Sequence, residues 1–340
     1  MELIPSNTNI DFIKYRNPCL LASLAVIAIG LVVMFAQGGP NLGIDFAGGS
    51  LVQVRIKQNA NIADVRGALS GLEVGSDAVQ QVGTDEFLIR TAMKGERTVS
   101  VDPKSAGENE QQSDPATRVT SALVAKFGKD NVELLKAETV GPRVGAELRS
   151  KAILAVTLAT LLMGIYITIR FEWRFGVGAA VALFHDVLVT VAGLVVFGYE
   201  LDLSIVAALL TIVGFSVNDT VVVSDRIREN MRKDRRAPLA DIINRSINET
   251  LSRTILTSGT AITTVLALYL IGGPVIHGFA FSLLVGFIAG VYSSVYIAAP
   301  IVLVFEKGRG PRPATATAES ASGKKESKAA RKDARLPRTA

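Results

Sequence analysis

Asp219 is the residue whose surroundings in this sequence most clearly point to chemistry. It lies in GFSVNDTVVVSDRIREN, residues 214–230, which follows an apolar run and keeps a helix-compatible pattern to its end. A carboxylate in hydrocarbon costs roughly 2.5–3.5 kcal/mol on insertion scales, so it needs a partner or a purpose. A buried acid whose proton affinity changes when its neighbours move is the element that a proton-driven machine requires.

The natural cation for Asp219 is Arg253, in ETLSRTILTSGTAITT at the start of the next apolar segment. Thr257 follows at i+4 and so shares the face of Arg253 on a helix. Asn218 is a small polar neighbour that permits close helix association and hydrogen bonding. Asp219, Arg253 and Thr257 are therefore the predicted proton-coupling residues, with a structural ion pair that fixes helix register as the alternative reading.

His185 and Asp186 form a second ionisable pair, about ten residues into the apolar run VGAAVALFHDVLVTVAGLVVF. Adjacent residues point about 100° apart around a helix, so we expect the two side chains not to meet one partner. A role in a proton relay and a structural role both stay open. Cys19 is the one cysteine and the two histidines lie far apart, which predicts no disulfide, no metal site and no cofactor other than protons as the coupling ion.

Membrane-spanning helices must position these residues. The chain has 340 residues, of which 49% are apolar, and a positive mean hydropathy of +0.36. Several nearly uncharged runs reach about 18 residues, the length at which a helix crosses a bilayer. The six predicted spans are residues 18–36, 152–169, 176–197, 203–224, 254–272 and 278–305.

Lysine and arginine alternate between the short loops and so predict an orientation. Arg170 and Arg174 bound one loop and eight basic residues lie within 225–253, whereas GYELDLS and GGPVIHG carry none. The positive-inside rule then places both termini, residues 1–17 and 306–340, in the cytoplasm. The basic tail has no aromatic residues for stacking, so we expect a disordered, solvated end and no binding of nucleic acid.

Residues 37–148 fall between the first two spans and are predicted to form an external domain. Alternating and amphipathic patterns give the order β-α-β-β-α-β, which is the ferredoxin-like, split βαβ arrangement of an α+β domain. The polar stretch 94–113 reads as a mobile insertion before the second helix. Whether this domain binds a substrate or only docks a partner subunit stays open.

Residues 149–305 are predicted to form the rest of an all-α bundle of six transmembrane helices. Pro238 begins a predicted cytoplasmic amphipathic helix, 238–251, whose apolar stripe suits contact with membrane lipid at the interface. A carboxylate-lined face cannot remain against lipid, so the six helices need a partner. A second six-helix protein related by pseudo-two-fold symmetry would cover that face.

Five stretches, in order, give the sequence a resemblance to a known family. They are NLGIDFAGGSLVQV, ETVGPRVGAELR, RFEWRFGVGAAVALFHDV, GFSVNDTVVVSDRIREN and INRSINETLSRTILTSGTAIT. Over about residues 11–305 the chain resembles the SecF family of protein-export membrane proteins, which work with SecD beside the Sec translocon. It resembles the wider resistance–nodulation–division transporters more remotely.

The resemblance implies a function and partners. It implies a non-enzymatic accessory motor that uses the proton gradient with SecD to draw preprotein out of the SecYEG translocon, with YajC as a further partner. The family's aspartate of the VNDT stretch corresponds to Asp219, and the arginine and threonine of SRTxxT correspond to Arg253 and Thr257. The chain departs from the family pattern in residues 94–113 and in its long tail.

Three other functions make different demands on the sequence. A small-molecule proton antiporter of the same superfamily needs larger or duplicated external domains and a doubled chain. A non-transporting scaffold would tolerate Asp219→Asn but not the loss of the external domain. An intramembrane aspartyl protease needs a Gly-x-Gly-Asp context, which neither Asp186 nor Asp219 has.

Overall fold

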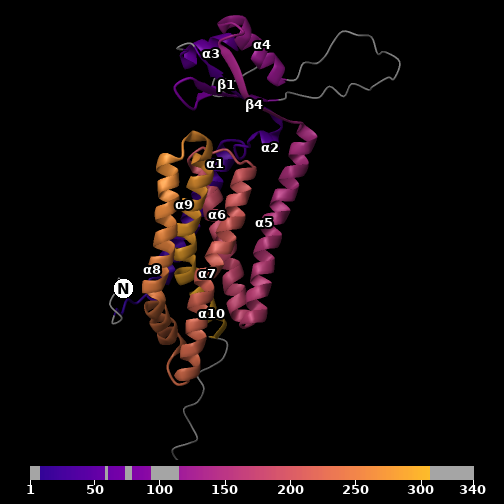
Figure 1. The fold of residues 1–340 in the computed structure, drawn as a ribbon. Coiled ribbons are helices and arrows are strands. Elements are labelled where there is room, and N and C mark those ends of the chain that lie inside the picture. The colour runs from indigo at the N-terminus through magenta and orange to yellow at the C-terminus, as the bar shows by residue number, and fades with distance from the viewer. Residues whose placement is uncertain (1–7, 58–59, 73–78, 93–114, 307–340) are drawn as a thin grey trace, which may run out of the picture. The chain divides into compact units, whose positions relative to one another are not determined.

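The computed structural model describes residues 8–57, 60–72, 79–92 and 115–306. The predictions for 1–7, for the insertion 94–113 and for the tail beyond Glu306 lie outside the described residues. Figure 1 shows a set of long helices that lie alongside one another and a smaller part built of short helices and strands.

Six helices of the described residues are long and apolar enough to cross a membrane, which confirms the predicted number of spans. They are α1 (Arg16–Ala36), α5 (Pro142–Arg170), α6 (Trp173–Val196), α7 (Leu203–Lys233), α8 (Leu239–Ile271) and the sixth, Pro274–Phe305. The sixth is made of α9 (Pro274–Ser293), a π-helical segment η2 (Ser294–Ala298) and α10 (Ala299–Glu306). Large apolar side chains of α1 and α5 are exposed, as expected for surfaces that face lipid.

The smaller part contains, in its described residues, a four-stranded antiparallel sheet with two helices and a further single-turn helix. Its elements are α2 (Ile44–Ala47), β1 (Gly49–Ile56), α3 (Ile62–Ala68), β2 (Val79–Gln81), β3 (Glu86–Ala92), α4 (Pro115–Phe127) and β4 (Val132–Val140). The strand order is β2-β3-β1-β4, with Gly49 of β1 paired to Ala92 and to Val140. Alternate residues of β1 are buried with α3 and α4, and this forms the core of the part. The sequence pattern gave no sign of α2.

Helix ends follow local sequence signals. Asp202 caps α7, where its carboxylate accepts a hydrogen bond from the backbone N–H of Ile205 at 2.9 Å. Asn61 and Asp64 form a capping box at the start of α3. Pro142 and Pro274 occupy the first turns of α5 and α9, where a missing N–H costs nothing.

The cytoplasmic amphipathic helix predicted for 238–251 is not a separate element. It forms the first part of α8, because the sequence between it and the predicted span contains neither glycine nor proline to end a helix. Its apolar stripe is buried in one cluster with α7, and the cluster contains Ile242, Ile243 and Ile247 of α8 with Val223 and Ile227 of α7. The stripe therefore contacts protein rather than the membrane interface, which corrects the prediction.

A short segment before β1 is bonded to the link between α6 and α7. Gly43 donates its backbone N–H to the carbonyl of Leu201 at 2.8 Å, and Leu201 donates in return to Asn41 at 2.8 Å. The carboxylate of Asp45 accepts from the backbone N–H of Leu203, the first residue of α7, at 3.0 Å. The segment therefore fixes the N-terminal end of the helix that carries Asp219.

Two glycines allow the chain to enter β1. Gly48 and Gly49 have φ values of 79° and 150°, which side chains with a Cβ rarely adopt. A Cβ on Gly48 would lie 2.8 Å from the Cα of Pro142, and one on Gly49 would lie 2.4 Å from the carbonyl oxygen of Thr91. The Gly-Gly pair of the sequence is thus required for α5 and β3 to approach β1.

An ion pair joins β3 to the same link: Arg90 donates to Glu200 at 2.5 Å. Burial raises the pKa of the Glu200 carboxyl, Arg90 opposes that rise, and Asp202 adds to it. Because the pKa of Glu200 is higher in the folded than in the unfolded chain, ionised Glu200 lowers the stability of the fold. This loss of stability appears as the pH rises from the ordinary carboxyl pKa of 4.5 through the raised pKa of the folded chain.

Arg90→Met should raise the pKa of Glu200 further, because it removes the positive charge that favours the ionised carboxylate. We expect a loss of about 1 kcal/mol in the free energy of unfolding near pH 7, and the loss should shrink as the pH falls toward 4.5. Melting temperatures of the full chain across this range measure it, with Arg90→Met/Glu200→Gln as the control that removes the pH dependence. An equal loss at every pH would contradict this assignment.

Candidate functional site

Asp219 lies in the interior of the helical bundle, at the contact between α7 and α8. Asp219 is 2% exposed. The hydroxyl of Ser258 on α8 donates to its Oδ2 at 2.6 Å, and both residues are buried. A single hydroxyl from a neighbouring helix therefore holds this carboxylate, and the bond depends on the contact between the two helices.

The structure does not bring Thr257 to Asp219. Thr257 is exposed, and its hydroxyl donates to the backbone carbonyl of Arg253 at 3.0 Å on its own helix. Ser258 is one residue further along and so lies about 100° around the helix, on the face that meets α7. The predicted hydroxyl partner was therefore wrong by one position, although the predicted pair of helices was right.

Arg253 is also exposed. Among the described residues, no hydrogen bond or ion pair joins its guanidinium to Asp219, but its charge acts on the carboxylate through space. Asn218 is exposed as well. The roles of Arg253 and Thr257 in proton coupling stay predictions, and the geometry adds Ser258 to them.

His185 and Asp186 contact each other and otherwise bond different residues, as expected for neighbours that point about 100° apart around a helix. The imidazole Nδ1 lies 3.0 Å from Asp186 Oδ1, because the ring turns back toward the neighbouring carboxylate. Asp186 Oδ2 accepts from the hydroxyls of Ser216 on α7 at 2.6 Å and Ser293 on α9 at 2.9 Å. Asp186 is 0% exposed and His185 is 8% exposed, so the pair sits inside the bundle.

Further buried hydroxyl side chains flank Asp219 along α7. Ser216 lies one turn before Asp219 on α7, and Thr220 follows Asp219 and contacts Ser294 of η2 at 3.2 Å. Sequence reasoning missed Ser258 and the serines of the sixth span. The available signal was the Ser-Ser pair of VYSSVY inside an otherwise apolar run.

The sixth span changes its helical geometry beside these groups. The π-helical segment begins at Ser294, directly after Ser293, whose hydroxyl reaches Asp186. Single π turns inside α-helices occur frequently at functional sites, because they redirect side chains that a regular helix would place elsewhere. The apolar pattern of residues 278–305 gave no sign of this segment.

Glycines bring α9 close to α7 at this level. A Cβ on Gly286 would lie 2.2 Å from the Cδ1 of Ile212, and one on Gly290 would lie 3.1 Å from the Cβ of Ser216. The two glycines are four residues apart, the small-xxx-small spacing of tightly associated membrane helices. This approach allows Ser216 and Ser293 to reach the same carboxylate oxygen.

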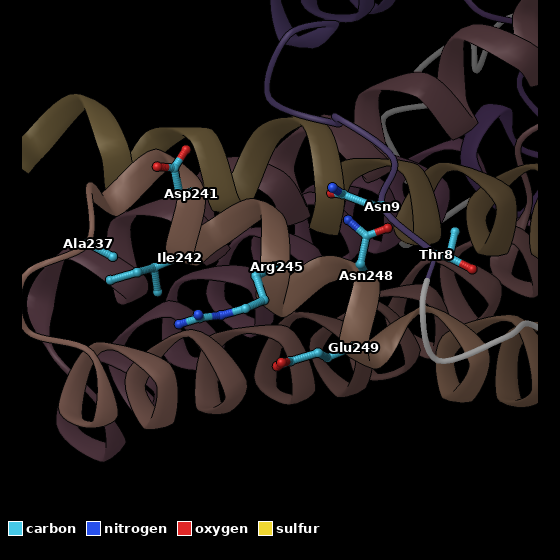
Figure 2. A pocket seen from close by; sticks show the side chains of 8 residues that line it. All are labelled: Thr8, Asn9, Ala237, Asp241, Ile242, Arg245, Asn248 and Glu249. Carbon is cyan, nitrogen blue, oxygen red and sulfur yellow. The ribbon is translucent and has the colours of Figure 1, made fainter.

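A polar cavity of about 420 Å³ lies between the N-terminal segment and α8. Figure 2 shows its lining: Thr8, Asn9, Ala237, Asp241, Ile242, Arg245, Asn248 and Glu249. Beside it, the amide of Asn248 accepts from the N–H of Ile10 and donates to its carbonyl, both at 2.9 Å. The cavity therefore belongs to the attachment of the N-terminal segment, and its lining includes neither aspartate of the membrane interior.

Two family models match the chain. "Protein export membrane protein SecD/SecF, C-terminal" matches residues 119–308, and "SecD/SecF GG Motif" matches residues 33–60, the segment that contains Gly48 and Gly49. The chain that carries this fold and these buried acids is therefore a member of a class of multi-pass membrane proteins named for protein export.

Individual relatives agree with these matches. "Protein translocase subunit SecF" of Magnetococcus marinus is 45% identical, over 94% of this chain and 99% of that protein. The subunit of the same name from Gemmatimonas aurantiaca is 40% identical, over 90% of each. The chain belongs to the SecD/SecF family, and the relatives that it matches over nearly their whole length are SecF subunits.

A solved structure has the same fold. The crystal structure of SecDF, a translocon-associated membrane protein from Thermus, superposes with a TM-score of 0.73 at 33% identity and covers 90% of this chain. This chain spans 40% of the length of that SecDF chain.

Proposed function

We propose that this chain is an accessory subunit of the Sec protein-export machinery. In this proposal it uses the proton gradient, together with SecD, to promote preprotein translocation across the bacterial inner membrane. Membership of the SecD/SecF family supports the export role. The observation that carries the proton coupling is the buried carboxylate of Asp219, held by the Ser258 hydroxyl across the contact between α7 and α8.

The contact between α7 and α8 makes the proton affinity of this site depend on conformation. While the helices touch, the hydroxyl of Ser258 and the charge of Arg253 both favour the ionised carboxylate. If the helices separate, Asp219 loses the hydroxyl and the protonated form becomes favoured in its buried position. Protons that bind from outside and leave inside would then drive the helices through a cycle.

We further propose the arrangement around this site. The strand order β2-β3-β1-β4 with its two helices supports a ferredoxin-like, split βαβ domain on the external side. Both termini lie in the cytoplasm. The chain acts as a coupling subunit rather than an enzyme, and protons serve as the coupling ion without a further cofactor.

The exposed polar side chains of α8 support a partner within the membrane. Arg253, Thr257, Thr260 and Thr264 are all exposed. The threonine hydroxyls donate to carbonyls of their own helix, so Arg253 is the group that needs a protein partner rather than lipid. We propose SecD as that partner, with SecYEG, YajC and the preprotein as further contacts of the assembly.

The same exposed face favours a second candidate, a scaffold that holds the translocon together without moving protons. A small-molecule antiporter is a weaker alternative.

The test of the proposed function uses inverted membrane vesicles in which this chain is the only SecF. It measures preprotein import with ATP in the presence and absence of a proton gradient. We expect the gradient to stimulate import only when this chain is present. Equal stimulation without the chain would overturn the proposal, and a loss of ATP-driven import would favour the scaffold.

A further inference from the structure

The cluster around His185 and Asp186 is a buried ionisable group that the proposed role of Asp219 does not use. It joins four helices: α6 carries the pair, α1 contributes Ser23, α7 contributes Ser216, and α9 contributes Tyr292 and Ser293. Its contacts form one chain of hydrogen bonds from the backbone of α1 to the carboxylate. The hydrogens in that chain can be assigned from its two ends.

At its α1 end, the chain of hydrogen bonds begins at the backbone carbonyl of Cys19, which can only accept a hydrogen bond. The hydroxyl of Tyr292 donates to the carbonyl oxygen of Cys19 at 2.5 Å, so its single hydrogen is used there. The hydroxyl of Ser23 donates to the oxygen of Tyr292 at 3.2 Å, so its hydrogen is used as well. The contact of 3.0 Å between Ser23 Oγ and His185 Nε2 must then take its hydrogen from Nε2.

The inner end is equally constrained. Asp186 Oδ2 accepts hydrogens from two serine hydroxyls, and Oδ1 faces His185 Nδ1 at 3.0 Å. If Asp186 were ionised and Nδ1 bare, two lone pairs would face each other in a buried site, which is unfavourable. In the other neutral tautomer the hydrogen is on Nδ1. The single hydroxyl hydrogen of Ser23 would then have to serve both His185 Nε2 and the Tyr292 oxygen, so one of these two contacts would lack a hydrogen.

We propose that His185 and Asp186 form a second proton-binding site, which holds one proton more than an ionised aspartate beside a neutral histidine. That proton lies between Nδ1 and Oδ1. Whether the pair is written as imidazolium and carboxylate or as imidazole and carboxylic acid, its net charge is zero. A net charge of zero fits a pair that is 0% and 8% exposed inside a helical bundle.

The site depends on how the four helices meet. The titratable residues on the neighbouring elements are Tyr292 of α9, which bonds the carbonyl of Cys19 on α1, Tyr296 of η2, whose ring contacts that of Tyr292, and Asp219, one turn after Ser216 on α7. Tyr166 of α5 is 55% exposed. Because the donors and acceptors come from α1, α7 and α9, separation of these helices removes the bonds that retain the proton. The inference rests on this geometry and not on the role of Asp219.

The small number of histidines makes the site measurable. The chain contains two, so the full chain with His277→Gln and ¹⁵N-labelled histidine reports His185 alone. In membranes near pH 7.5, about one unit above the ordinary histidine value, we expect Nε2 to carry a hydrogen. We also expect either a protonated Nδ1 by NMR or an infrared carboxylic-acid carbonyl band that Asp186→Asn removes. A neutral ring with no such band, whichever nitrogen carries its hydrogen, would overturn the proposal.

Two α1 variants separate this assignment from a merely structural contact. Ser23→Ala removes the acceptor of the Nε2 hydrogen and should allow the extra proton to leave, so the NMR or infrared signal should decrease at the same pH. Cys19→Ala keeps the backbone carbonyl that Tyr292 uses and should leave the signal unchanged. An unchanged signal in Ser23→Ala, or an equal loss in both variants, would contradict the assignment.

Discussion

Vesicles that carry Asp219→Asn are expected to import preprotein with ATP at the wild-type rate and to lose the stimulation by a proton gradient. Asparagine has nearly the same shape as aspartate, and its carbonyl oxygen can accept the Ser258 hydrogen bond of 2.6 Å. The contact between α7 and α8 should therefore persist. The amide cannot take up or release a proton in this range of pH, so the coupling step is removed while the fold is retained.

The matched control is Asp225→Asn, six residues along α7. Asp225 is exposed, so its replacement changes the same charge on the same helix without touching the buried site. Gradient stimulation should stay at the wild-type level in this variant. Copurification of the partner complex with both variants checks assembly. Full gradient stimulation in an assembled Asp219→Asn complex would remove the motor role and favour the scaffold.

The second large effect is expected at Ser258 and not at Thr257. Ser258→Ala leaves a buried carboxylate without its hydroxyl donor, which costs about 1–3 kcal/mol. Each 1.4 kcal/mol changes a protonation equilibrium about tenfold, so gradient stimulation should fall severalfold. Thr257→Val keeps the shape of the side chain and removes a hydroxyl that bonds its own helix, so we expect stimulation close to that of the wild type.

Import assays of the two variants at matched expression measure this contrast. The positions are adjacent and both are hydroxyl residues on α8, so each controls for the other. If Thr257→Val lost stimulation and Ser258→Ala kept it, the contact partner expected from i+4 spacing would be the correct one.

Sequence reasoning succeeded where long stretches of residues share one property. The six spans follow from apolar runs of sufficient length, and all six are confirmed. The predicted spans stop where charged residues mark the return to water, whereas α7 continues past Arg226 to Lys233. No glycine or proline lies between these two residues to end the helix.

The details of the site depend on information that helical spacing does not contain. Spacing places Arg253 and Thr257 on one face, but it does not say which face of α8 meets α7. Adjacent residues diverge around a helix, yet the ring of His185 can turn back to the carboxylate of Asp186. The π-helical segment arises from a shift of backbone hydrogen bonds that an apolar sequence does not reveal.

Infrared spectroscopy of Asp219 itself tests the central claim most directly. The full chain in membranes with its partner is compared with Asp219→Asn, and the carboxylic-acid carbonyl band that the variant lacks reports protonated Asp219. We expect this band to grow as the pH is lowered from about 9 to about 5, and to be stronger in Ser258→Ala than in the wild type at the same pH. The absence of an Asp219-dependent band throughout that range would contradict the claim that this carboxylate binds the coupling proton.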